Sequence, residues 1–469
     1  MSRRRKKIPE GTFETVIESL SHDGRGVAHI DGKTIFIRNA LPGEKIIFKY
    51  TNMRGSFNEG VAIEILSASS ERVKPTCTHA DMCGGCCLQH LTNDAQIQHK
   101  QQIMLEMLQH FGKVIPQEIL SPLIGVNYGY RHKARLGVRC VDKKGGVLVG
   151  FREQNGRYIT EITGCQILHP SIGDKIIPLR KLITSLNSLR VIPQIEVAIG
   201  DTKTALIIRH LKPLPLIDLE KIIVFAKQQK LEIYLQPKGP NTIHKIWPEK
   251  SLSSPRTRPA GSSSSVSSSP RTRPAGSSND DRLSYSLPDH QIKLQFHPSD
   301  FTQVNPAINR QMINQAIELL DPQPDENILD LFCGLGNFTI PLAKHCKHIV
   351  GIEGNNQMVE RGYENAAQNN IKNIDFYEFN LKEDFTRIPW AKNYNKLLLD
   401  PPRSGAAEVI AKIKIFNPEK ILYISCNPAT FARDAGGLAN NQGYKLAKIG
   451  IMDMFPHTAH METMALFLR

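Results

Sequence analysis

Short apolar segments alternate with helix-length segments through residues 300–469 of the chain. The apolar segments read ENILDLF, HIVGIEG, IDFYEF, KLLLD and KILYIS. Each has the length of a strand, and the residues between them are enough for a helix, which is the spacing of parallel strands joined by crossover helices. We therefore predict an α/β fold for this region, with a parallel sheet covered by helices on both faces.

A glycine-rich turn follows the first of these segments, in DLFCGLGNFTIPLA. Gly334 and Gly336 allow a tight turn and a close approach of the backbone to a ligand. The next segment ends in GIEG, where the Glu353 carboxylate suits two ribose hydroxyls. This order predicts a nucleoside cofactor. NAD is the rival cofactor, but its pattern requires a small residue where this chain has Thr339. The turn is more similar to that of S-adenosylmethionine-dependent methyltransferases.

Two further reactive residues follow strand-like segments. Asp400 follows a strand in LLLDPPRSG, and Cys426 follows the next one in LYISCNPATF. Ligand sites in parallel sheets lie at the carboxyl ends of strands, so we expect these residues to meet Glu353 and the glycine turn at one edge. The alternatives are a turn or helix-capping role for Asp400 and a buried structural thiol for Cys426. The shared position favours a site in which Cys426 is a nucleophile.

The composition and the first half of the chain indicate an RNA-binding protein. The net charge of +14 indicates a polyanionic partner, with solubility as the plain alternative. Residues 12–68 alternate like strands of a small antiparallel barrel, and SHDGRGVAHIDGKTIFIRNALPGEKI resembles the TRAM domain of RNA-modifying enzymes. RRRKK near the start fits an arm that touches phosphates. YRHKARLGVR fits either an RNA-facing strand or an ordinary exposed one.

The nine cysteines predict a metal site. The chain has no apolar segment of membrane-spanning length and no apolar signal core, so we expect a cytoplasmic protein whose thiols are ligands or catalysts. The expected ligands are three clustered thiols and one distant thiol: Cys77, Cys83, Cys86 and Cys165. Cys87 and Cys140 compete for the fourth place. Zinc, with His79 as a possible ligand, is one candidate metal.

Together these motifs resemble the bacterial uracil-C5 RNA methyltransferases. The matching stretches are DFTQVN, DLFCGLGNFTIPLA, DPPRSGA, SCNPATFARD and HTAHMET. The TRAM-like region and the cysteine cluster are similar to the branch of the family that acts on 23S ribosomal RNA, and the tRNA branch lacks both. The resemblance implies S-adenosylmethionine as the cofactor and a [4Fe–4S] cluster on the four cysteines. We expect a monomer with no membrane partner.

The resemblance also implies roles for single residues. It places six residues around the cofactor: Gln303, Phe332, Asn337, Glu353, Asn380 and Asp400. It makes Cys426 the nucleophile that adds to C6 of uracil, which turns C5 into a carbon nucleophile. It makes Glu462 the base that removes the C5 proton, and we expect partial desolvation to raise the pKa of Glu462. An ordinary surface carboxylate is the alternative for Glu462.

We expect three regions in the chain. Residues 1–70 form the basic arm and an OB-like TRAM barrel, residues 71–299 a mixed central Fe–S and RNA-binding domain, and residues 300–469 a Rossmann-like class I methyltransferase domain. SSPRTRPAGSS occurs twice and predicts a disordered insertion at 251–280. Two other functions stay open: a radical S-adenosylmethionine enzyme, whose C-x3-C-x2-C motif the chain lacks, and a non-catalytic rRNA-binding assembly factor.

Overall fold

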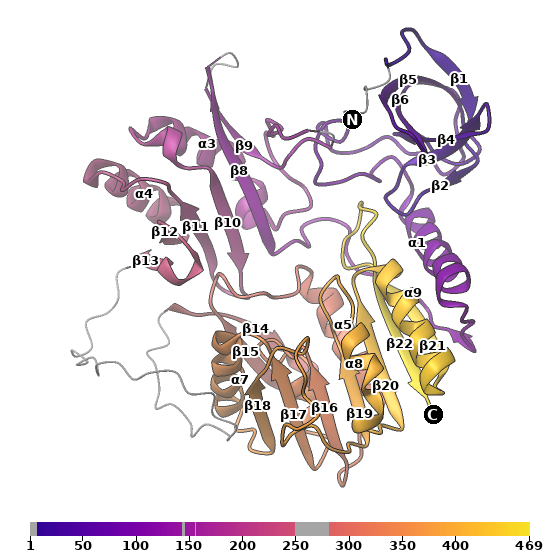
Figure 1. Cartoon of the computed structure of the whole chain (residues 1–469). Helices are drawn as coiled ribbons and strands as arrows, with labels where there is room; N and C mark the ends of the chain where they lie inside the picture. The colour runs from indigo at the N-terminus through magenta and orange to yellow at the C-terminus, as the bar shows by residue number, and fades with distance from the viewer. Residues whose placement is uncertain (1–6, 143–145, 155, 249–280) are drawn as a thin grey trace, which may run out of the picture.

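The computed structural model describes residues 7–142, 146–154, 156–248 and 281–469 (Figure 1). The described residues form four β-sheets, of six, six, two and eight strands. Most of the predicted basic arm and the predicted insertion lie outside the described residues. Within the described chain, no helix is both long enough and apolar enough to span a lipid bilayer.

The N-terminal sheet curves into a small barrel (Figure 1). Its strands are β1 (Phe13–Val16), β2 (Ser19–Leu20), β3 (Gly26–Ile30), β4 (Lys33–Arg38), β5 (Lys45–Met53) and β6 (Asn58–Ser67), in the order β1-β5-β6-β4-β3-β2. Side chains alternate across the sheet, so Ile35 and Ile37 of β4 are buried inside while Arg38 faces outward. The barrel predicted from the alternating sequence is confirmed.

The segment after the barrel packs against the C-terminal part of the chain. It forms α1 (Asn93–Met107), a π-helical turn η1 (Leu108–Gly112) and the short strand β7 (Glu118–Ile119). A Cβ atom at Gly112 would lie 2.6 Å from the Ala432 carbonyl oxygen, so only glycine permits the close approach of η1 to the last helix. β7 pairs in parallel with a strand of the C-terminal sheet. Contacts therefore cross the expected boundary at 299/300.

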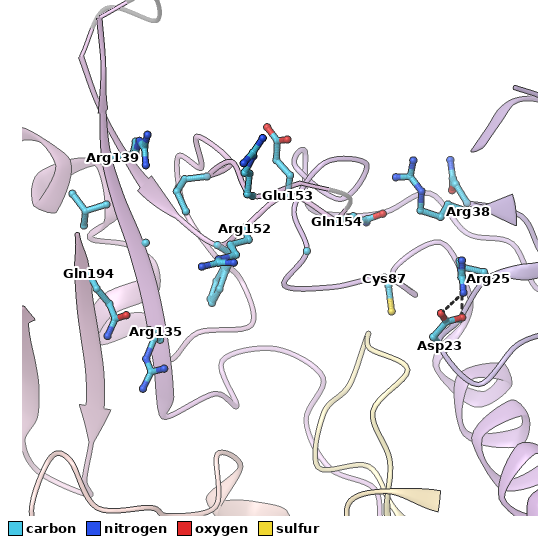
Figure 2. Close-up of a pocket in the computed structure, with 18 of the residues that line it drawn as sticks. Asp23, Arg25, Arg38, Cys87, Arg135, Arg139, Arg152, Glu153, Gln154 and Gln194 are labelled. Carbon is cyan, nitrogen blue, oxygen red and sulfur yellow. Dashed lines mark hydrogen bonds and ion pairs between the residues drawn. The ribbon is translucent and has the colours of Figure 1, made fainter. Parts of the chain in front are cut away.

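The central sheet mixes parallel and antiparallel pairs, as predicted. Its strands are β8 (Lys133–Val141), β9 (Gly146–Gly150), β10 (Gln194–Ile199), β11 (Thr204–Arg209), β12 (Glu232–Gln236) and β13 (His244–Trp247), in the order β13-β12-β11-β10-β8-β9. The accompanying helices are α2 (Pro170–Gly173), α3 (Ile176–Ser185) and α4 (Leu216–Gln229), with 3-10 turns η3 (Leu189–Val191) and η4 (Pro240–Thr242). β8 faces the barrel across a cavity (Figure 2).

The C-terminal sheet confirms the predicted α/β fold. Its strands are β16 (Asn327–Leu331), β17 (His348–Glu353), β18 (Ile374–Glu378), β19 (Lys396–Leu399), β20 (Lys420–Ser425), β21 (Lys445–Met452) and β22 (Glu462–Leu468). The order is β18-β17-β16-β19-β20-β22-β21-β7. β16 to β20 pair in parallel, whereas β22 runs antiparallel to both of its neighbours.

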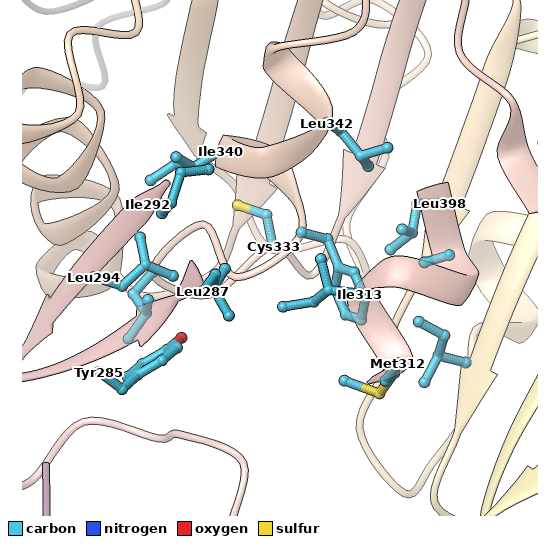
Figure 3. Close-up of a cluster of buried hydrophobic side chains, with 14 of the residues drawn as sticks. Tyr285, Leu287, Ile292, Leu294, Met312, Ile313, Cys333, Ile340, Leu342 and Leu398 are labelled. Carbon is cyan, nitrogen blue, oxygen red and sulfur yellow. The ribbon is translucent and has the colours of Figure 1, made fainter. Parts of the chain in front are cut away.

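Helices cover both faces of this sheet. They are α5 (Pro306–Leu320), α6 (Thr339–Ala343), α7 (Asn356–Gln368), α8 (Ala407–Ala411) and α9 (Pro428–Gly436), with the short turns η6 (Pro288–His290), η7 (Ile413–Ile415) and η8 (Gly437–Asn441). The hairpin of β14 (Leu283–Leu287) and β15 (Ile292–Phe296) packs with α5 on one face (Figure 3). Successive strand residues alternate between two buried clusters: Leu398 joins the first, and Leu397 and Leu399 the second.

Candidate active site

Four adjacent parallel strands end at the predicted site residues. In sheet order the strands are β17, β16, β19 and β20, and the residues at or just after their ends are Glu353, Phe332, Asp400 and Cys426. The predicted meeting of these residues at one edge of the sheet is confirmed. Sequence periodicity sufficed here because each residue follows an apolar run whose direction the crossover helices fix.

The turn after β16 adopts an unusual backbone conformation. Phe332, Gly334 and Gly336 have φ angles of 67°, 56° and 92°, which favour glycine at the last two positions. The Gly334 N–H donates to one oxygen of the Glu353 carboxylate at 3.1 Å, and the Asn355 N–H donates to the other at 3.0 Å. Burial raises the pKa of Glu353, and these N–H groups oppose the rise. The turn and the acid therefore form one fixed unit.

The other three predicted cofactor residues have different settings. The Asn337 side chain accepts from the Tyr285 hydroxyl at 2.8 Å and exchanges two hydrogen bonds with Asn309. These partners, which sequence reasoning missed, tie the turn to β14 and α5. Asn380 follows β18 and bonds within its own exposed turn. Gln303 lies in the segment between β15 and α5.

A buried carboxyl group lies beneath the glycine turn. Asp330, in β16, is fully buried and its Oδ2 accepts from the Thr339 hydroxyl at 2.6 Å. Its Oδ1 has no hydrogen-bond partner among the described residues. Burial, aided by the charges of Asp400 and Glu353, raises the pKa of Asp330 to about 8. Thr339 thus begins α6 and anchors that helix to β16, which explains the departure from the dinucleotide pattern.

The Asp400 loop is fastened to the turn that carries Cys426. Asn427 caps α9, because its side-chain oxygen accepts from the Ala429 N–H at 3.0 Å. Its amide nitrogen donates to the Arg403 carbonyl at 3.1 Å. The Asn427-Pro428 pair ends the extended segment by starting this helix. Sequence reasoning missed Arg403. Burial raises the pKa of Cys426, and the positive charge of Arg403 opposes that rise.

Cys426 and Glu462 lie at the same end of neighbouring strands. β20 and β22 are antiparallel with Ser425 opposite Thr463, so Cys426 just after β20 is close to Glu462 at the start of β22. Burial, followed by the charges of Glu462 and Asp400, raises the pKa of Cys426 to about 11. Glu462 is 6% exposed. Burial and then Asp400 raise its pKa well above the usual value. The surface-carboxylate alternative for Glu462 is therefore wrong.

One small cavity gathers the four predicted metal ligands. Its lining includes Cys77, Cys83, Cys86 and Cys165. Burial raises the pKa of Cys83 to about 11 and that of Cys86 to about 12, and neighbouring thiols add to both. Within the described residues, no three His, Cys, Asp or Glu side chains are arranged as a metal-binding group. The four thiols share one cavity.

The competing ligands have other partners. The Cys87 sulfur accepts from the Ala459 N–H at 3.3 Å, in the loop before Glu462. Cys140 lies on β8, and the His79 ring bonds to the Thr163 hydroxyl at 3.0 Å. The lining of the cysteine cavity includes none of these three side chains. Cys165 is consequently the fourth thiol that the fold brings to the cluster.

A larger cavity of about 950 Å³ separates the barrel from β8 (Figure 2). Its lining includes six arginines, Arg25, Arg38, Arg135, Arg139, Arg152 and Arg157, against three carboxylates, Asp23, Glu59 and Glu153. Within YRHKARLGVR, Lys133 points inward and donates to the carbonyls of Pro298 and Asp300. Arg135 and Arg139 face the cavity. This concave surface is therefore cationic and suits phosphates.

Known proteins resemble the chain over its whole length. A family model described as tRNA (Uracil-5-)-methyltransferase matches residues 279–469, and a TRAM domain model matches residues 11–46. A relative from Hahella chejuensis named 23S rRNA (uracil(1939)-C(5))-methyltransferase RlmD is 49% identical, over 100% of this chain and 99% of that protein. The chain belongs to the RlmD family. Another RlmD, from Alcanivorax borkumensis, is 47% identical over 100% of this chain and 99% of that protein.

RlmD-family membership agrees with the fold. A solved Pyrococcus abyssi tRNA (uracil-54, C5)-methyltransferase, in complex with S-adenosyl-L-homocysteine, has a TM-score of 0.70, 21% identity, and covers 97% of this chain and 100% of that chain. At this identity the match establishes the fold alone. The expected class I methyltransferase fold and TRAM domain are thus confirmed. The family supports an RNA uracil-C5 methyltransferase and neither of the two alternative functions.

Proposed function

We propose that this RlmD-family enzyme transfers a methyl group from S-adenosylmethionine to C5 of a uridine in 23S rRNA. The reaction corresponds to the one in the names of its relatives. The observation that carries the proposal is the pairing of Ser425 with Thr463, which sets a thiol and a buried carboxyl side by side. Uracil-C5 methylation requires both groups, since one must add to C6 and the other must remove a proton from C5.

We propose that the cofactor binds at the carboxyl edge of the sheet. The proposed contacts are the six residues implied by the family resemblance: Gln303, Phe332, Asn337, Glu353, Asn380 and Asp400. The fixed turn at Gly334 allows close approach, and the Glu353 carboxylate at the end of β17 suits ribose hydroxyls. When bound, S-adenosylmethionine supplies an electrophilic methyl group to the edge where Cys426 lies.

The proposed chemistry runs through Cys426. Its thiol releases a proton to solvent, and the thiolate forms a bond to C6 of uracil while the electrons of the C5–C6 double bond move into the O4–C5 enolate. C5 then takes the methyl group, and S-adenosylhomocysteine leaves. The pKa of about 11 leaves little Cys426 thiolate at neutral pH. The positive charge of the nearby Arg403 favours the thiolate and so promotes its addition to C6. Arg403 is exposed and lies in the Asp400 loop. Its proposed role is electrostatic, and it forms no covalent bond.

Glu462 is proposed to complete the cycle. Its carboxylate removes the C5 proton, the C6–S bond breaks, and the thiolate of Cys426 is restored. A carboxyl group with a raised pKa is a stronger base than an ordinary one once it is ionised. Burial of Glu462 also keeps water from hydrating that carboxylate.

The six-arginine cavity between the barrel and β8 is proposed to bind the rRNA backbone. Six guanidinium groups on one concave surface offer several phosphate contacts. The target base must leave its stack to expose C6 to Cys426. A cytoplasmic monomer divided at 1–70, 71–299 and 300–469 remains part of the proposal.

A [4Fe–4S] cluster held by Cys77, Cys83, Cys86 and Cys165 is also proposed. The support is one buried cavity that contains four soft sulfur donors. Metal binding would deprotonate these thiols and would offset the burial that raises the pKa of Cys83 and of Cys86. Methyl transfer consumes no electrons, so the proposed role of the cluster is to hold the segment between the barrel and α1.

Methylation of defined RNAs tests the function. Purified protein is incubated with methyl-labelled S-adenosylmethionine and 23S rRNA transcribed without modifications, with a tRNA transcript as the control. The proposal predicts label in 5-methyluridine at one 23S rRNA position and little in tRNA. Efficient labelling of tRNA alone, or label in any other nucleoside, would contradict it.

A further inference from the structure

We propose that Gln96 and Lys100, on α1, are positioning residues for Glu462. They hold the loop between β21 and β22, which runs from Asp453 to Met461 and leads directly into Glu462. The inference rests on the role of Glu462 as the base proposed above. The helix α1, which precedes the methyltransferase sheet in the chain, would thereby influence the proton-removal step.

The backbone of Glu462 has support from one side only. In β22, Glu462 pairs with Met452 of β21. The pairing of β22 with β20 begins only at the next residue, Thr463. Glu462 therefore pairs with β21 but lies just beyond the end of the pairing between β22 and β20. We infer that the position of Glu462 is sensitive to the adjoining loop, which joins it to Met452 across the hairpin.

Gln96 fixes the middle of this loop. Its side chain is 1% exposed, and its Oε1 accepts from the His457 N–H at 2.8 Å. Its Nε2 donates to the Leu88 and Leu91 carbonyls at 3.1 and 2.9 Å. The carbonyl of His457 accepts in turn from the Leu88 N–H at 2.9 Å. His457 has a φ of 66°, a conformation that a residue with a side chain keeps only when its surroundings impose it.

Lys100 fixes the start of the same loop. Its side chain is 2% exposed, and its Nζ donates to Asp453 Oδ1 at 2.7 Å and to the Phe455 carbonyl at 3.2 Å. A buried ion pair contributes little net stability because desolvating both charges offsets their attraction. The pair instead defines the geometry of the loop, since the buried Lys100 ammonium and the buried Asp453 carboxylate each need the other as a partner.

Two further contacts hold the loop, one from the cysteine segment and one from the segment that leads into β8. The Tyr130 hydroxyl donates to the Pro456 carbonyl at 3.1 Å, and the Ala459 N–H donates to the Cys87 sulfur at 3.3 Å. The loop is thus fixed at several positions by residues outside the C-terminal sheet. Cys426, in contrast, is placed by β20 and by the Asn427 cap. Loosening the loop should therefore impair proton removal and leave thiol addition almost unchanged.

The variant Gln96→Met tests this difference, since it keeps the side-chain length and removes every hydrogen bond. Gln102→Met is the matched control, because Gln102 lies on the exposed side of the same helix and bonds only to Glu106. Single-turnover reactions with 23S rRNA and methyl-labelled S-adenosylmethionine follow the covalent protein–RNA adduct by denaturing electrophoresis. We expect adduct formation within about twofold of wild type, and adduct breakdown slower by about tenfold or more, with label in the accumulated adduct. Gln102→Met should match wild type.

A double variant, Lys100→Met with Asp453→Leu, leaves no unpaired buried charge and should accumulate the same adduct. Equal slowing of formation and breakdown, or no slowing of either, in both variants would overturn the inference. Glu462→Gln is measured alongside. If it accumulates adduct and the α1 variants do not, positioning by α1 is wrong and the proposed base stands. If Glu462→Gln accumulates none, the proposed base is wrong, and the positioning role fails with it.

Discussion

Cys426 and Glu462 are brought together by one strand register, in which Ser425 of β20 lies opposite Thr463 of β22. Because β22 runs antiparallel to β20, the end of one strand meets the start of the other. Burial, and then the charge of Glu462, raises the pKa of Cys426. A thiol and a carboxyl group separated in the chain thereby lie together as the proposed catalytic pair.

Adduct formation should depend steeply on pH and on Arg403. The pKa of Cys426 is about 11, so the thiolate fraction, and the single-turnover rate with it, should rise about tenfold per pH unit between about pH 6.5 and 8.5. Arg403→Met should lower the rate across this range, because it removes a charge that favours the thiolate. Arg403→Lys should restore part of it, and Arg387→Met, in an exposed loop, is the control. A flat pH profile would show that another group takes the thiol proton.

Asp330 should make the folded protein less stable as the pH rises. Its folded pKa of about 8 exceeds the ordinary value of 3.8, so the folded protein keeps the proton up to about pH 8 while the unfolded chain releases it above about pH 4. The contribution of Asp330 to stability is therefore full below about pH 4 and is lost as the pH rises towards 8. The loss amounts to at most about 1.4 kcal/mol per pH unit. Asp330→Asn, which stays neutral and can still accept from Thr339, should flatten this dependence. Thermal unfolding at about pH 5 and pH 8 measures it, with the exposed Asp325→Asn as the control. Parallel curves for wild type and Asp330→Asn would refute the assignment.

The arginine-lined cavity should contribute phosphate contacts. Arg139→Gln is expected to weaken 23S rRNA binding and to reduce the slope of log affinity against log salt by about one unit. Arg209→Gln, at the exposed end of β11, should change neither quantity. Filter binding across a series of salt concentrations measures both. Unchanged slopes for Arg139→Gln and Arg135→Gln would place the RNA elsewhere.

The cysteine cavity should bind iron. Anaerobically purified protein is expected to contain about four iron and four sulfide per chain and to be brown. Cys83→Ser should lose the iron and lower the melting temperature, whereas Cys140→Ser, on β8, should keep both. Metal analysis and absorbance spectra decide the matter. One zinc per chain without iron would reject the cluster.

Much of this site could be predicted because it depends on local sequence. Glu353, Asp400 and Cys426 each follow a short apolar run, and parallel strands bring such positions to a common edge whatever the details of packing. The barrel was equally predictable, since alternating burial in β4 follows directly from alternating residue types. Local patterns of this kind survive in the sequence as periodicity.

The partners of these residues could not be predicted in the same way. Gln96 reads as an ordinary polar residue of a helix, yet it holds a loop far away in the chain. Tyr285 and Asn309 give no sign in the sequence that they bind the Asn337 side chain. Arg403 lies in the motif DPPRSGA, but its effect on the pKa of Cys426 depends on how two loops pack. Such contacts leave no periodic trace, because tertiary structure alone creates them.

Denaturing electrophoresis of Glu462→Gln after reaction with 23S rRNA and methyl-labelled S-adenosylmethionine tests the central claim most directly. This variant can add its thiol and transfer the methyl group, but it cannot remove the C5 proton efficiently. A protein–RNA band that carries the label should therefore accumulate. Cys426→Ala should give no such band while it still binds RNA and cofactor. Normal turnover by Cys426→Ala, or free turnover by Glu462→Gln without a labelled adduct, would contradict the account.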